Sequence, residues 1–234
     1  MLLTCLRWAR RLTRRLTAAR FDYARLYSRA DLSRDHWSIV GPSSREEYEA
    51  LGRAKLHDLI EQGLTPTSRI LDVGCGTGQL TAPMTHYLDE AGVYCGTDVA
   101  PEAVAFCRER FGRHNFTFLV NEITRLPMDA RFDVVFLGSV LTHLYPEEVG
   151  ALLKEVARLL DAGGFVMADA FVTEAPAGHV GHRGMVRISE AVLRRAFAQA
   201  GLSARQLFAT PERRCRRVMY RLWHAAVNEA SRGR

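Results

Sequence analysis

The sequence has no long apolar run: no stretch of about 18 consecutive apolar residues occurs in its 234 residues, so no transmembrane helix is expected. It also lacks Cys-x-x-Cys spacing, and its five cysteines are scattered and odd in number. This pattern argues against a disulfide framework and a zinc site, and it favours reduced thiols in a cytosolic protein. The chain contains no internal repeat and no long low-complexity linker.

Lysine is nearly absent. Lys55 and Lys154 are the only two, so arginine carries almost all of the formal net charge of +6. Because an arginine bias of this kind also reflects genome composition, it identifies no partner. With 47% hydrophobic residues, the chain is long enough for one well-packed α/β domain and a small appendage.

The most informative segment starts at Ser68 and reads SRILDVGCGTGQ. A short apolar run containing Asp72 leads into three glycines at alternate positions: Gly74, Gly76 and Gly78. The pattern predicts a buried strand, a tight turn and a helix from about Gln79, because glycine adopts unusual dihedral angles and lets a ligand approach the backbone. A dinucleotide-binding loop, Gly-x-Gly-x-x-Gly, would need its last glycine where Gln79 stands.

Four further strand patterns follow in a regular order. Residues 93–98 end in Asp98, where Rossmann-type folds bind a ribose diol. The other three strands are expected at residues 116–122, at 131–138 and within 159–169, a segment that includes a Gly-Gly turn leading into its strand. Together with the Asp-x-Gly-x-Gly-x-Gly loop, these segments resemble the class I S-adenosylmethionine-dependent methyltransferases over roughly residues 69–171.

The resemblance, with the alternation of strand and helix patterns, predicts an α/β fold built on a Rossmann-like, doubly wound, seven-stranded sheet. In the family, an antiparallel C-terminal hairpin completes this sheet, and it is expected here at residues 202–210 and 215–223. Crossover helices are expected at residues 79–90, 101–111, 146–160 and 189–200. Residues 1–62 are expected to form an N-terminal helical cover, and residues 63–234 the methyltransferase domain.

The first twenty residues predict a basic amphipathic helix, because arginines and apolar residues fall on opposite sides and no acid occurs before Asp22. Such a helix can lie on an anionic membrane surface, act as a mitochondrial-type targeting segment, or pack on the domain or on a second copy of the chain. The corresponding expectations are a cytoplasmic protein that is peripheral at a membrane in the first case and a homodimer in the last. Residues 43–62 predict another helix, since Ser44 and Glu47 have capping-box spacing.

The resemblance implies S-adenosylmethionine (SAM) as cofactor and assigns roles to three acids. Asp72 helps to neutralise the ammonium group, Asp98 accepts from both ribose hydroxyls, and Glu122 accepts from the adenine amino group. Backbone N–H groups of the glycine loop suit the carboxylate. Asp98 has a competing role as the cap of the helix that follows it. The expected cofactor contacts are Asp72, Gly74, Cys75, Gly76, Gly78, Asp98, Val99, Glu122, Ile123 and Gly138.

His143, just past the fourth strand, is the candidate general base, because a neutral imidazole takes up protons near pH 7. The competing interpretation is a histidine that packs or caps within its own short helix. Expected substrate contacts come from the N-terminal cover and from the Gly-rich loop after the fifth strand: Tyr23, His36, Trp37, His179 and His182. The last two have His-x-x-His spacing but no carboxylate or cysteine partner, so no metal is expected.

The motifs that the sequence lacks exclude several classes of methyl acceptor. The fourth strand continues as Phe-Leu-Gly-Ser and not as Asn/Asp-Pro-Pro-Tyr, which argues against methylation of amino groups in DNA. The paired glutamates of protein arginine methyltransferases and the acidic cluster of magnesium-dependent catechol enzymes are missing as well. The sequence therefore predicts methyl transfer to a small molecule, most often to oxygen of a natural product or a lipid-linked metabolite. The alternative is a non-catalytic SAM-fold binding module, docked to a membrane or a protein through the basic helix.

Overall fold

The computed structural model of the protein describes residues 22–175, 178–179, 184–212 and 214–225. Within them nine strands form one sheet in the order β3-β2-β1-β4-β5-β7-β6, with β9 beside β5 and β8 beside β9. The strands are β1 (Arg69–Val73), β2 (Val93–Asp98), β3 (Phe116–Val120), β4 (Phe132–Leu137), β5 (Leu160–Thr173), β6 (Gly178–His179), β7 (Val186–Ser189), β8 (Leu202–Glu212) and β9 (Cys215–His224). The helices are α2 (Tyr23–Ser28), α3 (Leu32–Asp35), η1 (Ser38–Val40), α4 (Arg45–Glu61), α5 (Thr81–Tyr87), α6 (Pro101–Phe111), η2 (Leu141–His143), α7 (Pro146–Leu159) and α8 (Glu190–Gln199).

The predicted fold is confirmed: β1 to β5 pair in parallel, and β8 and β9 form an antiparallel hairpin joined to β5 through β9. The short strands β6 and β7 are an addition to the seven expected strands. β5 has 14 residues and β4 has 6, so β5 runs past the end of β4. The free edge of that extension pairs with β7, from Phe171↔Arg187 to Thr173↔Ser189.

The predicted Gly-Gly turn lies inside β5 and not before it. The register between β4 and β5 shifts between Phe132 and Val134, and Gly163 and Gly164 lie in the extra length of β5. A Cβ on Gly164 would lie 2.7 Å from the backbone oxygen of Asp133, so the close approach of the two strands requires glycine there. The glycines therefore form a bulge that leaves the parallel pairing of the two strands intact.

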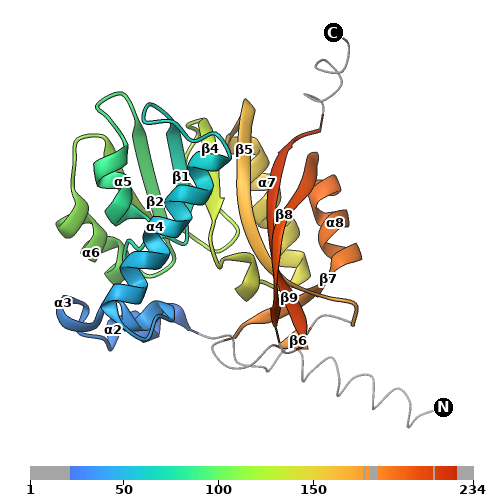
Figure 1. Ribbon diagram of the computed structural model, residues 1–234, viewed down its shortest axis with the longest axis horizontal. Helices are drawn as coiled ribbons and strands as arrows, with labels where there is room; N and C mark the ends of the chain where they lie inside the picture. Colours follow the sequence, from blue (N-terminus) through green and yellow to red (C-terminus); the bar gives the residue numbers. More distant parts are fainter. Residues whose placement is uncertain (1–21, 176–177, 180–183, 213, 226–234) are drawn as a thin grey trace.

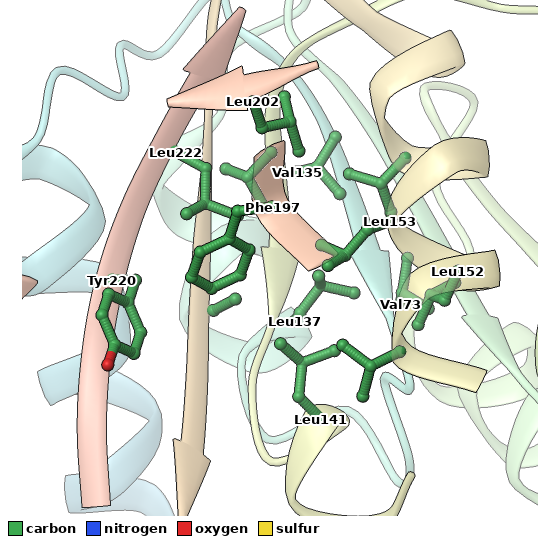
Figure 2. Packing of buried hydrophobic residues seen from close by; sticks show 14 of the residues in the cluster. Val73, Val135, Leu137, Leu141, Leu152, Leu153, Phe197, Leu202, Tyr220 and Leu222 are labelled. Carbon is green, nitrogen blue, oxygen red and sulfur yellow. The ribbon is translucent and has the colours of Figure 1, made fainter. Parts of the chain in front are cut away.

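Helices cover both faces of the sheet (Figure 1). On one face α4, α5 and α6 pack through Leu59, Met84 and Val104. On the other face α7 and α8 pack on β1, β4 and β5, and Figure 2 shows this apolar core. Its labelled side chains are Val73, Val135, Leu137, Leu141, Leu152, Leu153, Phe197, Leu202, Tyr220 and Leu222. Because parallel strands with both faces covered are buried, their polar chemistry is confined to the strand ends.

The N-terminal helices α2, α3 and η1 lie against the start of α6 (Figure 1), where Tyr27 and Ile39 pack on Ala100 and Ala103. The helix expected at residues 43–62 is α4, and the Ser44 side chain accepts from the backbone N–H of Glu47 as the capping spacing predicts. The basic segment of residues 1–20 lies outside the described residues. None of the helices in the described part of the chain has the length and apolarity needed to cross a membrane.

Candidate functional site

The glycine loop joins β1 to α5 at the carboxyl end of the sheet. All three of its glycines have positive φ: Gly74 at 74°, Gly76 at 54° and Gly78 at 83°. The backbone N–H groups of Gly74 and Cys75 both donate to Thr97 O at the end of β2, over 2.7 and 2.9 Å. The loop turns tightly enough for two successive N–H groups to reach one carbonyl oxygen. Its three left-handed φ angles favour glycine at these positions.

A crevice is expected beside this loop from the strand order alone. The chain passes from β1 to β2 and β3 on one side and then returns to β4 on the other, so β1 and β4 flank the switch point where ligands bind in open α/β sheets. The tips of β1 and β4 meet there, because a Cβ on Gly74 would lie 2.7 Å from Cγ2 of Val140. Gly138 is packed similarly tightly, since a Cβ there would overlap the ring of Phe136.

Asp98 stands at the end of β2 and is 7% exposed. Its Oδ2 accepts from the backbone N–H of Gly76 and its Oδ1 from that of Ala100, both over 2.9 Å. Burial raises the pKa of Asp98, and these two hydrogen bonds oppose the rise. Asp98 therefore ties the glycine loop to Ala100. Ala100 itself is the N-cap of α6 and no side chain caps it, so Asp98 does not fill the helix-cap role considered for it. Each carboxylate oxygen still has a lone pair for a further donor.

Asp72 on β1 is buried as well, at 3% exposure, and the hydroxyl of Tyr94 donates to its Oδ2 over 2.6 Å. Burial raises the pKa of Asp72 to about 6, although the Tyr94 hydrogen bond and the charge of Lys55 lower it. Two carboxyl groups thus lie near the ends of neighbouring strands, with Asp72 beside the position where β1 becomes the glycine loop.

Lys55 approaches Asp72 from α4, a contact that the sequence did not predict. Its Nζ donates to Oε1 of Gln79 over 2.6 Å and lies 5.8 Å from the ring centre of Phe136. Burial lowers the pKa of Lys55, while the charges of Asp72 and Asp169 raise it. The only sequence signal was that Lys55 is one of two lysines in an arginine-rich chain.

The polar end of β3 presents Asn121 to the buried side and Glu122 to solvent. Asn121 is 8% exposed, its backbone N–H donates to Asp98 O, and its Oδ1 is buried with no hydrogen-bond partner among the described residues. Glu122 is exposed, and it forms an isolated bridge with Arg125. Ile123, which follows Glu122, and Val99, which follows Asp98, are half-buried. Asn121, which was not among the expected contacts, is therefore a further candidate for adenine.

The segment after β4 brings two of the expected residues together. The hydroxyl of Tyr23, on α2, lies 3.1 Å from each ring nitrogen of His143, and the two rings meet edge-on with centres 5.1 Å apart. Both residues are half-buried. The N-terminal cover and the end of β4, which are 120 residues apart in sequence, thus meet through this pair.

The other expected substrate contacts are placed less directly. His36 is 7% exposed and packs between Tyr48 and Phe106, with ring centres 5.5 and 5.1 Å away, and burial lowers its pKa. Its backbone oxygen accepts from the hydroxyl of Thr77 in the glycine loop, so His36 seats the cover on that loop. Trp37 is half-buried next to it.

The Gly-rich loop after β5 is described only in part. The backbone of His179 belongs to β6 and pairs with Val186, whereas His182 lies outside the described residues. No group of three or more histidine, cysteine or acidic side chains among the described residues is arranged to hold a metal ion.

Cys75 is a packed thiol in the glycine loop, 6% exposed. A hydrogen bond with Cys107 and burial both raise its pKa well above the usual value. The Cys107 thiol lies 3.3 Å from Gly76 O. Since thiol reactivity requires a low pKa and exposure, these two cysteines support the loop and are not nucleophiles.

The residues at this edge of the sheet fit SAM. Two buried carboxyl groups suit its ammonium group and its ribose diol, and the unpartnered Oδ1 of Asn121 suits an amino group on its adenine. The left-handed glycines give the backbone the approach that the methionine portion needs.

Comparisons with known proteins agree with this geometry. Residues 70–164 match the model of a family described as a methyltransferase domain. Over 112 residues the chain is 33% identical to the fatty-acid O-methyltransferase of Mycolicibacterium smegmatis, covering 47% of this chain and 40% of that protein. Over 141 residues it is 32% identical to a tRNA N(3)-cytidine methyltransferase of Gallus gallus, covering 56% and 38%. The chain thus spans well under two thirds of these relatives' length.

Among solved structures, the magnesium protoporphyrin IX methyltransferase of Synechocystis PCC 6803 with bound SAM superposes with a TM-score of 0.61 and 20% identity. The match covers 88% of this chain and all of that one. This likeness concerns the fold alone.

Proposed function

We propose, from the premise that this chain carries a class I SAM-dependent methyltransferase domain, that it transfers a methyl group to oxygen of a small-molecule acceptor. The observation that carries the proposal is the pair of buried carboxyl groups, Asp72 and Asp98, on either side of a glycine loop at the switch point of the sheet.

The proposed cofactor contacts follow the strand order. Asn121 and Glu122 at β3 take the adenine, Asp98 at β2 the ribose, and Asp72 at β1 the ammonium group. The glycine loop and Lys55, whose ammonium lies beside the loop residue Gln79, take the carboxylate. The bound cofactor supplies an activated methyl group, which this arrangement directs toward the tip of β4.

The chain's own contribution to the reaction is positioning and the exclusion of water, which supply most of the acceleration when no covalent intermediate is needed. Tyr23 and His143 close the acceptor side of the β4 tip, where Tyr23 holds the imidazole through its hydroxyl. We assign His143 as the general base that takes the proton of an acceptor hydroxyl, with Tyr23 as its orienting partner.

The acceptor class rests on the absent motifs and on one relative. The sequence lacks the motifs of enzymes that methylate amino groups of DNA or protein arginine, and a 33% identical relative is named for methylating fatty acids at oxygen. A nucleic-acid acceptor, as in the name of the tRNA relative, has less support, because the arginine cluster at residues 213–217 contains no aromatic residue.

Residues 1–20 are proposed to bind an anionic membrane surface, which would bring a lipid-linked acceptor to the site. Pelleting with vesicles that contain anionic lipids, compared with neutral vesicles and with a chain that lacks residues 1–20, tests this role. Equal pelleting of the two chains contradicts it.

The function itself is tested by transfer of label from [methyl-14C]SAM. Purified protein is incubated with the small-molecule fraction of cells that express it and, in parallel, with tRNA and DNA, and labelled products are identified by mass spectrometry. Label in an organic-extractable O-methyl product is expected. Label confined to nucleic acid, or no transfer by a protein that binds SAM, contradicts the proposal.

A further inference from the structure

Asp169, near the carboxyl end of β5, belongs to a network of three side chains that the proposed reaction has not used. It is 1% exposed, yet it is a carboxyl group on a strand whose other residues are largely apolar. Its Oδ1 accepts from the backbone N–H of Ser139 over 2.5 Å, and its Oδ2 accepts from Nε of Arg217 over 2.6 Å. Nη2 of Arg217 donates in turn to Oγ of Ser139 over 2.7 Å.

Ser139 has an unusual backbone at the centre of this network. Its φ is 62°, and it is the only non-glycine residue with positive φ among the described residues. A serine in this left-handed region is strained and persists only where its surroundings hold it. The N–H and the hydroxyl of Ser139 are both fixed by the network, and the hydroxyl of Thr142 donates to its backbone oxygen over 2.8 Å. The turn after β4 is therefore held rigidly beside Gly138.

The network lies on the acceptor side of the site. The order β3-β2-β1-β4-β5 assigns adenine, ribose, methionine and methyl group to the first four strands in turn. The next positions are those of β5 and β9, where Arg217 pairs in register with Phe171. Neighbouring strands are about 4.8 Å apart, so these positions lie one and two strand spacings beyond the methyl group. These positions therefore border the proposed acceptor side of the site.

Arg217 is the member of the network that faces outward. Its side chain is 42% exposed, against 2% for the side chain of Asp169. A guanidinium has five N–H donors, and the contacts with Asp169 and Ser139 involve Nε and Nη2, which leaves Nη1 for another acceptor. Because Asp169 and Ser139 fix one edge of the guanidinium plane, its free edge has a defined orientation. A planar carboxylate matches that edge.

The surrounding charges favour an anion that comes from the acceptor. Lys55 is committed to Gln79 and lies beside Asp72, where the methionine portion is proposed to bind. Arg217 stands on the far side of the β4 tip, and Ser139 lies between it and Gly138. Lys55 and Arg217 are thus placed for two different carboxylates, one of the cofactor and one of the acceptor.

We propose that Arg217 binds a carboxylate of the acceptor and that Asp169 and Ser139 orient it. This inference rests on the proposed methyltransferase function and narrows its substrate class to oxygen acceptors that also carry a carboxylate. Arg217 is the specificity-determining residue, and Asp169 is a positioning residue that acts through it. The carboxylate is held at β9 while the oxygen that receives the methyl group faces His143.

The test measures binding to the protein saturated with S-adenosylhomocysteine (SAH), by titration calorimetry. The probes are decanoate and benzoate, each beside its neutral alcohol, decan-1-ol and benzyl alcohol. The variants are Arg217→Gln, Arg217→Lys and the control Arg216→Gln, whose arginine pairs with Glu190. Since Arg217→Gln leaves Asp169 buried without its partner, the double variant Asp169→Asn/Arg217→Gln removes both charges together. Thermal unfolding verifies that each variant is folded.

The wild type is expected to bind at least one carboxylate about tenfold more tightly than its alcohol, because the carboxylate gains a charge-assisted hydrogen bond from Arg217. The double variant is expected to lose that preference. Arg216→Gln keeps the preference, and Arg217→Lys keeps part of it. SAH affinity stays within about twofold throughout. Loss of SAH affinity in Arg217→Gln with unchanged carboxylate binding would assign Arg217 to the cofactor and overturn the proposal. No carboxylate preference in a wild type that binds SAH overturns it too, whereas failure to bind SAH contradicts the proposed function itself.

Discussion

The proposed nucleoside half of the site, at the ends of β1, β2 and β3, differs in construction from the proposed acceptor half at β4, β5 and β9. In the first half backbone groups form the hydrogen bonds that hold the loop: its N–H groups donate to Thr97 O and to the carboxylate of Asp98. In the second half side chains from distant segments meet, and Arg217 bonds to Ser139, 78 residues away in sequence. A local motif specifies the first half, and long-range packing specifies the second.

The comparison predicts that the strongest effect on cofactor binding comes from the nucleoside half. Asp98→Ala removes the carboxylate that is proposed to accept hydrogen bonds from both ribose hydroxyls, and it also removes the anchor of the Gly76 N–H. SAM affinity is therefore expected to fall by about 1,000-fold, or about 4 kcal/mol. Titration calorimetry measures it. The affinity of Asp98→Asn, which keeps one oxygen acceptor, should fall less. Near wild-type affinity in Asp98→Ala would mean that the acid only ties the glycine loop to Ala100.

The acceptor half should show the opposite pattern, with loss of turnover and retention of cofactor. His143→Gln is expected to lower kcat by about 100-fold, the usual contribution of a general base, and to leave SAM affinity within about twofold. The solvent-exposed His57, replaced in the same way, is the matched control. Tyr23→Phe should lower kcat less. Unchanged kcat in His143→Gln would return that histidine to a packing role.

The backbone basis of the nucleoside half is tested by two glycines with similar dihedral angles. Gly78 has φ of 83° and a Cβ there would overlap the ring of Phe111, whereas Gly201 has φ of 73° and open space around it. Both alanine variants carry the strain of a left-handed residue, about 1 kcal/mol. Gly78→Ala should lose about 2 kcal/mol more in the free energy of unfolding, from overpacking. Equal losses by denaturant titration would show that the loop relaxes away from Phe111.

A smaller effect is expected from pH. In the free protein the pKa of Asp72 is about 6, and pairing with an ammonium group requires the ionised form. SAM affinity should therefore fall as pH falls through 6, by up to about tenfold between pH 6 and 5. Calorimetry at pH 5, 6 and 7 measures the slope, and Asp72→Asn should flatten it. An unchanged slope in that variant would assign the titration to another group.

The same shift affects the free protein with the opposite sign. Because the folded state holds the proton of Asp72 more tightly than the unfolded chain, the contribution of this group to stability is largest at low pH and declines as pH rises from about 4 to about 6. Weaker folding and tighter cofactor binding are thus expected over the same pH range.

The features that the sequence predicted are the ones that depend on local patterns. The first five strands, the helix at residues 101–111 and the two strands of the C-terminal hairpin were predicted, because each depends on patterns within about ten to twenty residues. The short β6–β7 pair was not, since it depends on how far β5 extends past β4. The glycine loop and Asp98 were identified through a motif whose physical reason is local.

Lys55, Asn121 and the Asp169–Arg217 pair were missed for a common reason. Their roles arise only when α4 and the ends of β3, β5 and β9 come together in the fold, and the sequence around each of them has no distinctive spacing. Asp169 lay in a segment interpreted only as a strand, and Arg217 in an arginine cluster that was weighed only as a nucleic-acid contact. A buried acid in an apolar strand was the one signal that could have drawn attention to the pair.

The central claim is that the carboxyl edge of β1 to β4 is a binding site for SAM, and titration calorimetry of the wild-type protein with SAM tests it most directly. The account predicts saturable binding with one molecule per chain and a dissociation constant in the micromolar range, about 1–100 μM. Absence of measurable binding at millimolar SAM, by a protein shown to be folded by its thermal transition, would contradict it.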